Sequence, residues 1–169
     1  MTTYSLDHIK KKVEELALKI NAPTNLLPSY GKQTEDAHPY IEVDNLGFMY
    51  YIFTERGHEF ERQMTNKIDD LLYWIFDKVT FSMACDYELK NRIEDKDSRR
   101  IMFEKQEELL GILNENWRVK IKVRHQGILK SNPFDDLAGL RAKYCGELRE
   151  QGLTETEINK LAYAKYPKN

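Results

Sequence analysis

DDLLYWIFDKVTFSMACDYELKNRIEDKDSRR, residues 69–100, is the stretch that decides the fold. Its first part repeats apolar residues at three- and four-residue steps, which predicts a buried helix; these residues are Leu71, Leu72, Ile75, Phe76 and Val79. The helical pattern continues toward Ile93 and then becomes strongly charged. The stretch therefore predicts a scaffold helix that leads into a polar surface.

The sequence before this helix predicts one helix and then a series of strands. A helix capped by Ser5 is expected to run to about Ile20. From Tyr40 onward apolar and polar residues alternate, which predicts strands, over residues 40–44, 48–53 and 58–64. In the third strand, His58, Phe60, Arg62 and Met64 form one side and Glu59, Glu61 and Gln63 the other, so we expect an amphipathic strand. The expected class is α+β, with a small antiparallel meander of about three strands packed against a mostly helical domain.

After the acidic loop, the sequence predicts only helices. Asp97 or Ser98 caps a helix to about Asn114, a second is expected over 117–129, a third begins around Asp135, and Thr154 with Glu157 forms a capping box for the last. A chain of 169 residues is long enough for one sizeable core. We expect a single domain over residues 1–169.

Charge and composition exclude several classes of protein. The net charge of -2 argues against nucleic-acid binding, which requires a basic surface. Residues 1–21 interleave lysines with glutamates and contain no continuous apolar run, so we expect neither a secretory signal nor a membrane span, and a cytoplasmic location. Cys85 and Cys145 are too far apart in sequence for a redox pair or half of a zinc site.

No catalytic motif is evident in the sequence. A metalloprotease zinc site needs a second histidine four residues after the first, but Arg62 occupies that position after His58. The eight glycines form neither a phosphate-binding loop nor a dinucleotide fingerprint. We therefore expect no enzyme activity, no cofactor and no metal. The alternative enzyme would use a site between sheet and helices, with His58, Glu59 and Tyr50.

The most acidic short loop contains Glu94, Asp95 and Asp97. Such a loop is a docking patch for a basic partner if its carboxylates are available, because charge pairs across an interface speed association and add specificity. The nearby Arg92, Arg99 and Arg100 offer the other possibility, in which these carboxylates are bound within the molecule.

A series of short motifs resembles the immunity protein 63 family of bacterial polymorphic toxin systems. The motifs are Leu27-Pro28-Ser29-Tyr30-Gly31, Pro39-Tyr40-Ile41-Glu42, Asp70-Leu71-Leu72-Tyr73-Trp74-Ile75-Phe76, Thr80-Phe81-Ser82, Asp86-Tyr87-Glu88-Leu89, Arg99-Arg100, Gln106 and Asn132-Pro133-Phe134-Asp135-Asp136. The family-like region is thus about 27–136, and residues 137–169 form a C-terminal helical extension.

The resemblance implies a small immunity protein that binds a cognate toxin and occludes its active site without performing chemistry. A cytoplasmic antidote implies a toxin that acts in the cytosol, such as a nuclease, and nuclease toxins tend to be basic. The charge argument then selects a set of toxin-binding candidates: Tyr87, Glu88, Glu94, Asp95, Asp97, Glu104 and Glu108. We expect a monomer or weak dimer; a regulatory module that dimerises through its helices is the remaining alternative.

Overall fold

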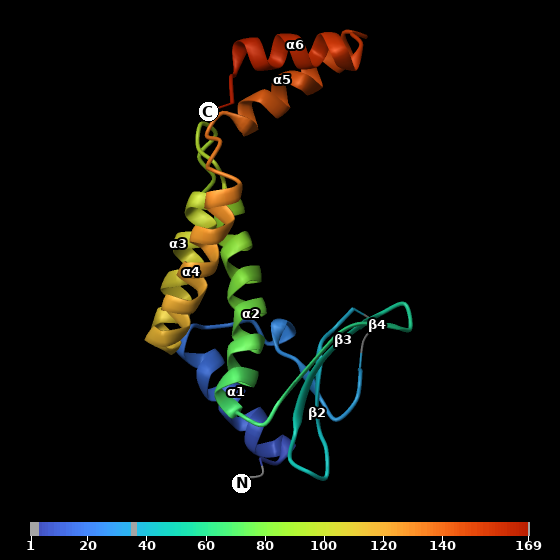
Figure 1. Cartoon of the computed structure of the whole chain (residues 1–169), viewed down its shortest axis with the longest axis vertical. Coiled ribbons are helices and arrows are strands. Elements are labelled where there is room, and N and C mark those ends of the chain that lie inside the picture. Colours follow the sequence, from blue (N-terminus) through green and yellow to red (C-terminus); the bar gives the residue numbers. More distant parts are fainter. Residues whose placement is uncertain (1–3, 35–36, 169) are drawn as a thin grey trace. The chain divides into compact units, whose positions relative to one another are not determined.

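A computed structural model describes residues 4–34 and 37–168. Figure 1 shows the order of the elements, which are α1 (Leu6–Lys19), η1 (Thr24–Leu26), β1 (Ser29–Tyr30), β2 (Tyr40–Val43), β3 (Met49–Glu55), β4 (His58–Thr65), α2 (Ile68–Lys90), α3 (Arg99–Leu113), α4 (Glu115–Ser131), α5 (Ala138–Glu150) and α6 (Glu155–Lys165). The class is α+β, as the sequence predicts. No helix among these residues has the length and apolar character needed to cross a membrane.

The chain forms two compact units. Unit 1 comprises the described residues up to Met83 together with Gln106–Ile121. Unit 2 comprises Ala84–Lys105 and the described residues from Lys122 onward. The sheet belongs entirely to unit 1, whereas the α2–α3 connection and the last two helices belong to unit 2.

The sheet has one more strand than the sequence predicts. Its order is β1-β2-β3-β4, with β2, β3 and β4 forming the expected antiparallel meander. The additional strand is β1, which pairs in parallel with β2 through Ser29–Tyr40 and Tyr30–Ile41. A strand of two residues behind Pro28 contains too few positions to show a period of two, so the pattern gave no signal for it.

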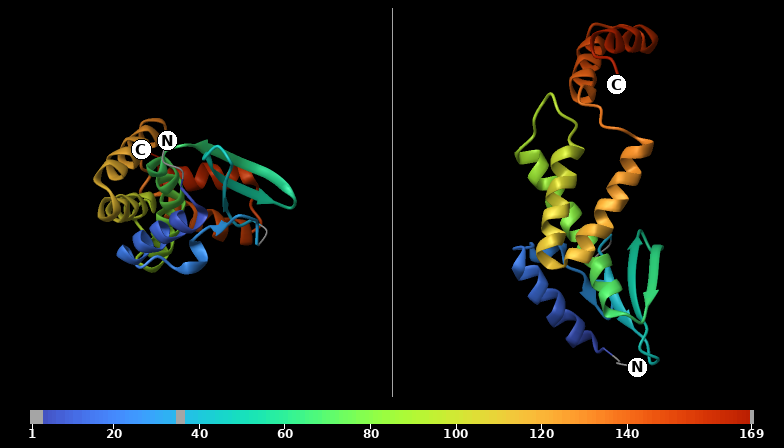
Figure 2. Two further views of the ribbon diagram at one scale, coloured as in Figure 1. Left: turned by 90° about the horizontal axis from the view of Figure 1, so that it is seen from below. Right: turned by 60° about the vertical axis from the view of Figure 1, so that its left-hand side comes forward.

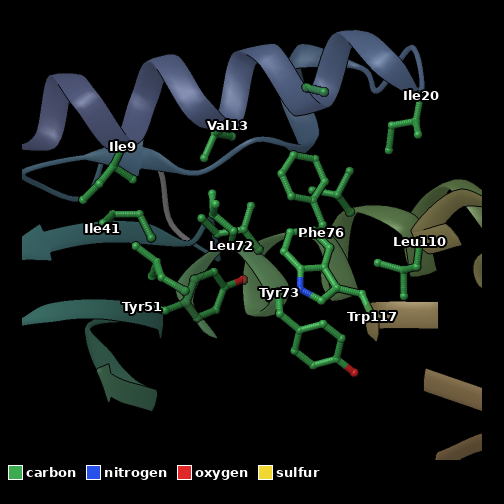
Figure 3. Close-up of a cluster of buried hydrophobic side chains, with 14 of the residues drawn as sticks. Ile9, Val13, Ile20, Ile41, Tyr51, Leu72, Tyr73, Phe76, Leu110 and Trp117 are labelled. Atoms are coloured by element: carbon green, nitrogen blue, oxygen red, sulfur yellow. The ribbon is translucent and has the colours of Figure 1, made fainter. Parts of the chain in front are cut away.

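One face of the sheet carries the core of unit 1. The Ser5 hydroxyl accepts a hydrogen bond from the His8 amide at 3.2 Å, which caps α1 as expected. Ile9 and Val13 of α1 are fully buried and belong to the same cluster as Ile41 of β2 and the first turns of α2. Figure 3 shows these side chains between α1, the sheet and α2. The apolar stripe of α2 is therefore the scaffold that its sequence predicted.

Trp117 of α4 completes this core. Its ring lies 6.2 Å from that of Phe76 in a stacked arrangement and 6.1 Å from that of Tyr73 edge-on (Figure 3). Its indole Nε1 donates to Asp69 at 3.2 Å, which satisfies the buried N–H. Nearby, the fully buried Gln106 donates from Nε2 to the backbone oxygen of Asp77 at 3.1 Å.

The structure shows which side of the third strand of the meander is exposed. Phe60 and Met64 of β4 are 66% and 56% exposed, whereas Glu61 and Gln63 are half-buried and Thr65 is buried. The sequence predicted two different sides for this strand, and the structure shows that the side of Phe60 and Met64 is the more exposed one. Alternation along a strand separates two faces, but it does not say which of them the rest of the fold covers.

The last two helices form a hairpin in unit 2. Thr154 and Glu157 make both bonds of the predicted capping box at the start of α6. Leu148 of α5 and Ile158 and Ala162 of α6 are buried.

Candidate functional site

The α2–α3 connection in unit 2 contains most of the predicted site residues. Glu94 and Asp95 are exposed there. Asp97, two residues farther on, is only 9% exposed. The acidic loop is thus divided between carboxylates that face solvent and one that does not.

Asp97 organises the backbone around it. Its carboxylate accepts hydrogen bonds from the backbone amides of Arg99 at 3.0 Å and Asp135 at 2.9 Å. It also receives two bonds from the Arg99 guanidinium, at 3.0 and 2.6 Å. The adjacent guanidinium holds the pKa of this carboxyl below its ordinary value. Asp97 therefore caps α3 and joins it to the segment that precedes α5.

The same segment is held by the two arginines of α3. The Arg99 guanidinium donates to the backbone oxygens of Asn132 and Pro133, each at 2.9 Å. Arg100 makes a bidentate pair with Asp136 at 2.7 and 2.9 Å, and this pair lowers the pKa of Asp136 to about 2. The Arg100 guanidinium also lies 4.1 Å from the centre of the Phe134 ring. The motifs Arg99-Arg100 and Asn132 to Asp136, distant in sequence, thus form one structural unit.

Arg141 extends this network into α5 and α6. It forms a buried ion pair with Asp135 and donates to the backbone oxygen of Tyr166 at 2.8 Å. Its guanidinium lies 4.6 Å from the centre of the Tyr163 ring. Sequence reasoning missed Arg141, because a single arginine in a charged helix carries no signal that it is buried.

Glu88 is also engaged within the molecule. It lies near the C-terminal end of α2, is 5% exposed, and accepts two hydrogen bonds from Arg92 at 2.8 Å each. This pair lowers the pKa of Glu88. Arg92, Arg99 and Arg100 therefore all bind carboxylates within unit 2, but only Arg99 binds one of the acidic loop, Asp97, as the second possibility had it.

The remaining candidates are exposed. Tyr87 is 42% exposed, with Lys105 Nζ 4.8 Å from its ring centre. Glu104 of α3 is exposed in unit 2, whereas Glu108, also exposed, belongs to unit 1. Tyr87, Glu94, Asp95 and Glu104 thus all belong to unit 2 and face solvent, whereas Glu88 and Asp97 of the same unit are buried.

A cavity of about 410 Å³ lies beside the connection, and its lining includes Arg92, Glu94, Asp97, Arg99 and Asp135. Several of these charged groups are bonded to each other or to the neighbouring backbone. Such a lining favours a structural role over acid–base chemistry, which needs titratable groups directed at a shared substrate.

The alternative catalytic set is not assembled. Glu59 is bonded to Arg62 and the Tyr50 hydroxyl donates to Asp44 at 2.9 Å. Tyr50 is paired with Met64, and Met64 lies six positions along β4 from His58. Tyr50 and His58 are therefore about 20 Å apart along the strand. Within the described residues, no group of three or more His, Cys, Asp or Glu could hold a metal ion.

Comparison with protein families adds the deciding observation. Residues 44–127, about half of the chain, match the family model described as Immunity protein 63. The chain belongs to the immunity protein 63 family. The matched region of this immunity protein runs from the turn before β3 into α4 and includes every predicted toxin-binding residue. Comparisons with curated proteins and with solved structures gave no match.

Proposed function

We propose that this protein neutralises a cognate bacterial toxin by binding it and occluding its active site, without performing chemistry itself. Membership of the immunity protein 63 family carries this proposal. The α2–α3 connection supports it, because Asp97 fixes the backbone there while Glu94 and Asp95 remain exposed to a partner.

The contact surface in this proposal comprises Tyr87, Glu94, Asp95 and Glu104 of unit 2. Glu108 of unit 1 is proposed separately as a toxin contact. Glu88 and Asp97 act beneath it as positioning residues, because their carboxylates are committed to Arg92 and Arg99. Exposed carboxylates on a rigid support attract a basic partner and raise its association rate. Tyr87 supplies an aromatic anchor of the kind that dominates binding energy at protein interfaces.

The partner in this proposal is a toxin domain of a polymorphic toxin system that acts in the bacterial cytosol, such as a basic nuclease. The immunity protein acts in the cytoplasm as a monomer or weak dimer. A tight inhibitor of this type needs only an interface of standard size with a few buried anchors.

Co-expression tests the proposal. Cells that produce the toxin domain encoded beside this protein should survive when the wild-type chain is present, and the two should co-purify. The double variant Glu94→Lys/Asp95→Lys should weaken the complex, whereas Glu147→Lys, which reverses an exposed carboxylate of α5 in the same unit, should not. If the wild-type chain neither protects nor co-purifies, the proposed function is wrong.

A further inference from the structure

The sheet of unit 1 has a second face that the core does not use. Side chains of adjacent strand positions point to opposite faces, and residues paired across strands share a face. Ile41, Met49 and Tyr51 face the core. The register places a second set on the opposite face: Tyr40, Glu42, Tyr50, Ile52, Arg62 and Met64. Within the described residues of unit 1, no helix lies over this open face (Figures 1 and 2).

The polar side chains of the open face are joined by contacts that centre on Arg62. The Arg62 guanidinium lies 5.4 Å from the centre of the Tyr50 ring and donates to both carboxylate oxygens of Glu59, at 2.9 and 2.8 Å. It also forms an ion pair with Glu42 at 3.7 Å. A surface that is already ordered loses little conformational entropy when a partner binds.

Large apolar groups are exposed on and beside this face. Met64 is 56% exposed, and Phe60, at the β-bulge of β4, is 66% exposed. Ile52 of the same face is fully buried, whereas Phe60 and Met64 keep more than half of their surface exposed to water. Phenylalanine, methionine, tyrosine and arginine are the residue types enriched at protein interfaces. The composition of the open face is therefore that of a contact surface.

The side chains on and beside the open face carry a net negative charge. Glu59, which is paired with Thr54 two positions from Ile52, and Asp44, which accepts from the Tyr50 hydroxyl, lie beside this face. Together with Glu42 they provide three carboxylates against the single guanidinium of Arg62. Desolvation and the nearby Glu42 both raise the pKa of Tyr40, as expected where an anionic field disfavours a further negative charge. The complementary partner is a basic surface.

We propose that the open face binds a basic, partly apolar surface of the cognate toxin, with Phe60 and Met64 at the apolar centre. The carboxylates of Glu42 and Glu59 meet lysine or arginine side chains of the toxin. This inference rests on the proposed function and adds a contact surface in unit 1 to the one proposed on the α2–α3 connection. A second copy of the chain is disfavoured, because pairing two such faces would bring carboxylates together.

Calorimetric titration with a catalytically inactivated form of the neighbouring toxin domain tests the inference. The double variant Phe60→Thr/Met64→Thr keeps strand propensity but removes the apolar groups. Its affinity should fall about tenfold or more. Leu18→Gln is the matched control, since it removes an apolar side chain that is 77% exposed on α1 of the same unit. Circular dichroism should show that all variants remain folded.

A second pair of variants tests the charge argument. Glu42→Gln/Glu59→Gln removes two carboxylates from the open face and should weaken binding mainly by slowing association. The association rate of this variant should also be less sensitive to salt than that of the wild type. Glu15→Gln, an exposed carboxylate on α1, should bind as the wild type does.

The outcomes separate the inference from the proposed function. If the wild-type chain binds and protects but the open-face variants bind equally well, the inference is overturned and the proposed function stands. If these variants instead abolish self-association in sedimentation while leaving toxin binding unchanged, a second copy covers the face and the inference is again overturned. If the wild-type chain does not bind at all, both are wrong.

Discussion

Replacing Asp97 by alanine should destabilise unit 2 even though Asp97 belongs to an acidic loop. The substitution leaves the Asp135 amide without its acceptor, at a cost of about 1 to 3 kcal/mol, and removes the cap of α3, at about 1 kcal/mol. The ion pair with Arg99 adds a smaller amount, about 1 kcal/mol, because the arginine side chain is 25% exposed and screened by solvent. We therefore expect a loss of about 3 to 5 kcal/mol.

Urea unfolding followed by far-ultraviolet circular dichroism measures this loss, and hydrogen exchange at the Asp135 amide locates it. Asp95→Ala is the matched control, since this residue is exposed in the same loop and its removal should change stability by less than about 0.5 kcal/mol. Equal stability of the two variants, with unchanged exchange at Asp135, would refute the assignment of Asp97 as a structural residue.

Three further predictions concern the two units. Arg100 lowers the pKa of Asp136 to about 2, so this pair stabilises the fold above about pH 4, the ordinary range of an aspartate, and the stabilisation is lost as the pH falls toward 2. In the Arg100→Met variant, the urea midpoint should fall less steeply as the pH is lowered than it does in the wild type. The same slope in both proteins would show that the Arg100–Asp136 pair does not cause this pH dependence. Thr154→Ala should cost about 1 kcal/mol through loss of the capping box in calorimetric melting, whereas Thr154→Ser should retain most of the stability. Phe76→Ala should cost about 3 to 5 kcal/mol and change the fluorescence of the stacked Trp117, and an unaltered unfolding midpoint would show that the core of unit 1 is assigned incorrectly.

Much of the fold was predictable because its strongest elements have clear periods. The apolar stripe of α2, the cap at Ser5 and the capping box at Thr154 each depend on a few neighbouring residues, so local sequence is sufficient. The short strand β1 was missed because its pairing with β2 is a contact between residues about ten positions apart, which leaves no periodic pattern in two residues. The exposure of Phe60 could not be predicted either, because the face of β4 that is covered depends on where the helices pack and not on the sequence of β4 itself.

The candidate site was predictable only in part. Sequence identified an acidic loop with arginines nearby, but it could not distinguish the exposed Asp95 from the buried Asp97. The distinction arises from the segment before α5, whose Asp135 amide reaches Asp97 from 38 positions along the chain. Such long-range contacts leave no periodic trace in one sequence.

The most direct test of the proposed function is titration of the catalytic activity of the purified neighbouring toxin domain with this protein. If the protein is an active-site-occluding antidote, activity should fall linearly and vanish at an equimolar ratio. Full toxin activity in the presence of excess folded protein would contradict it.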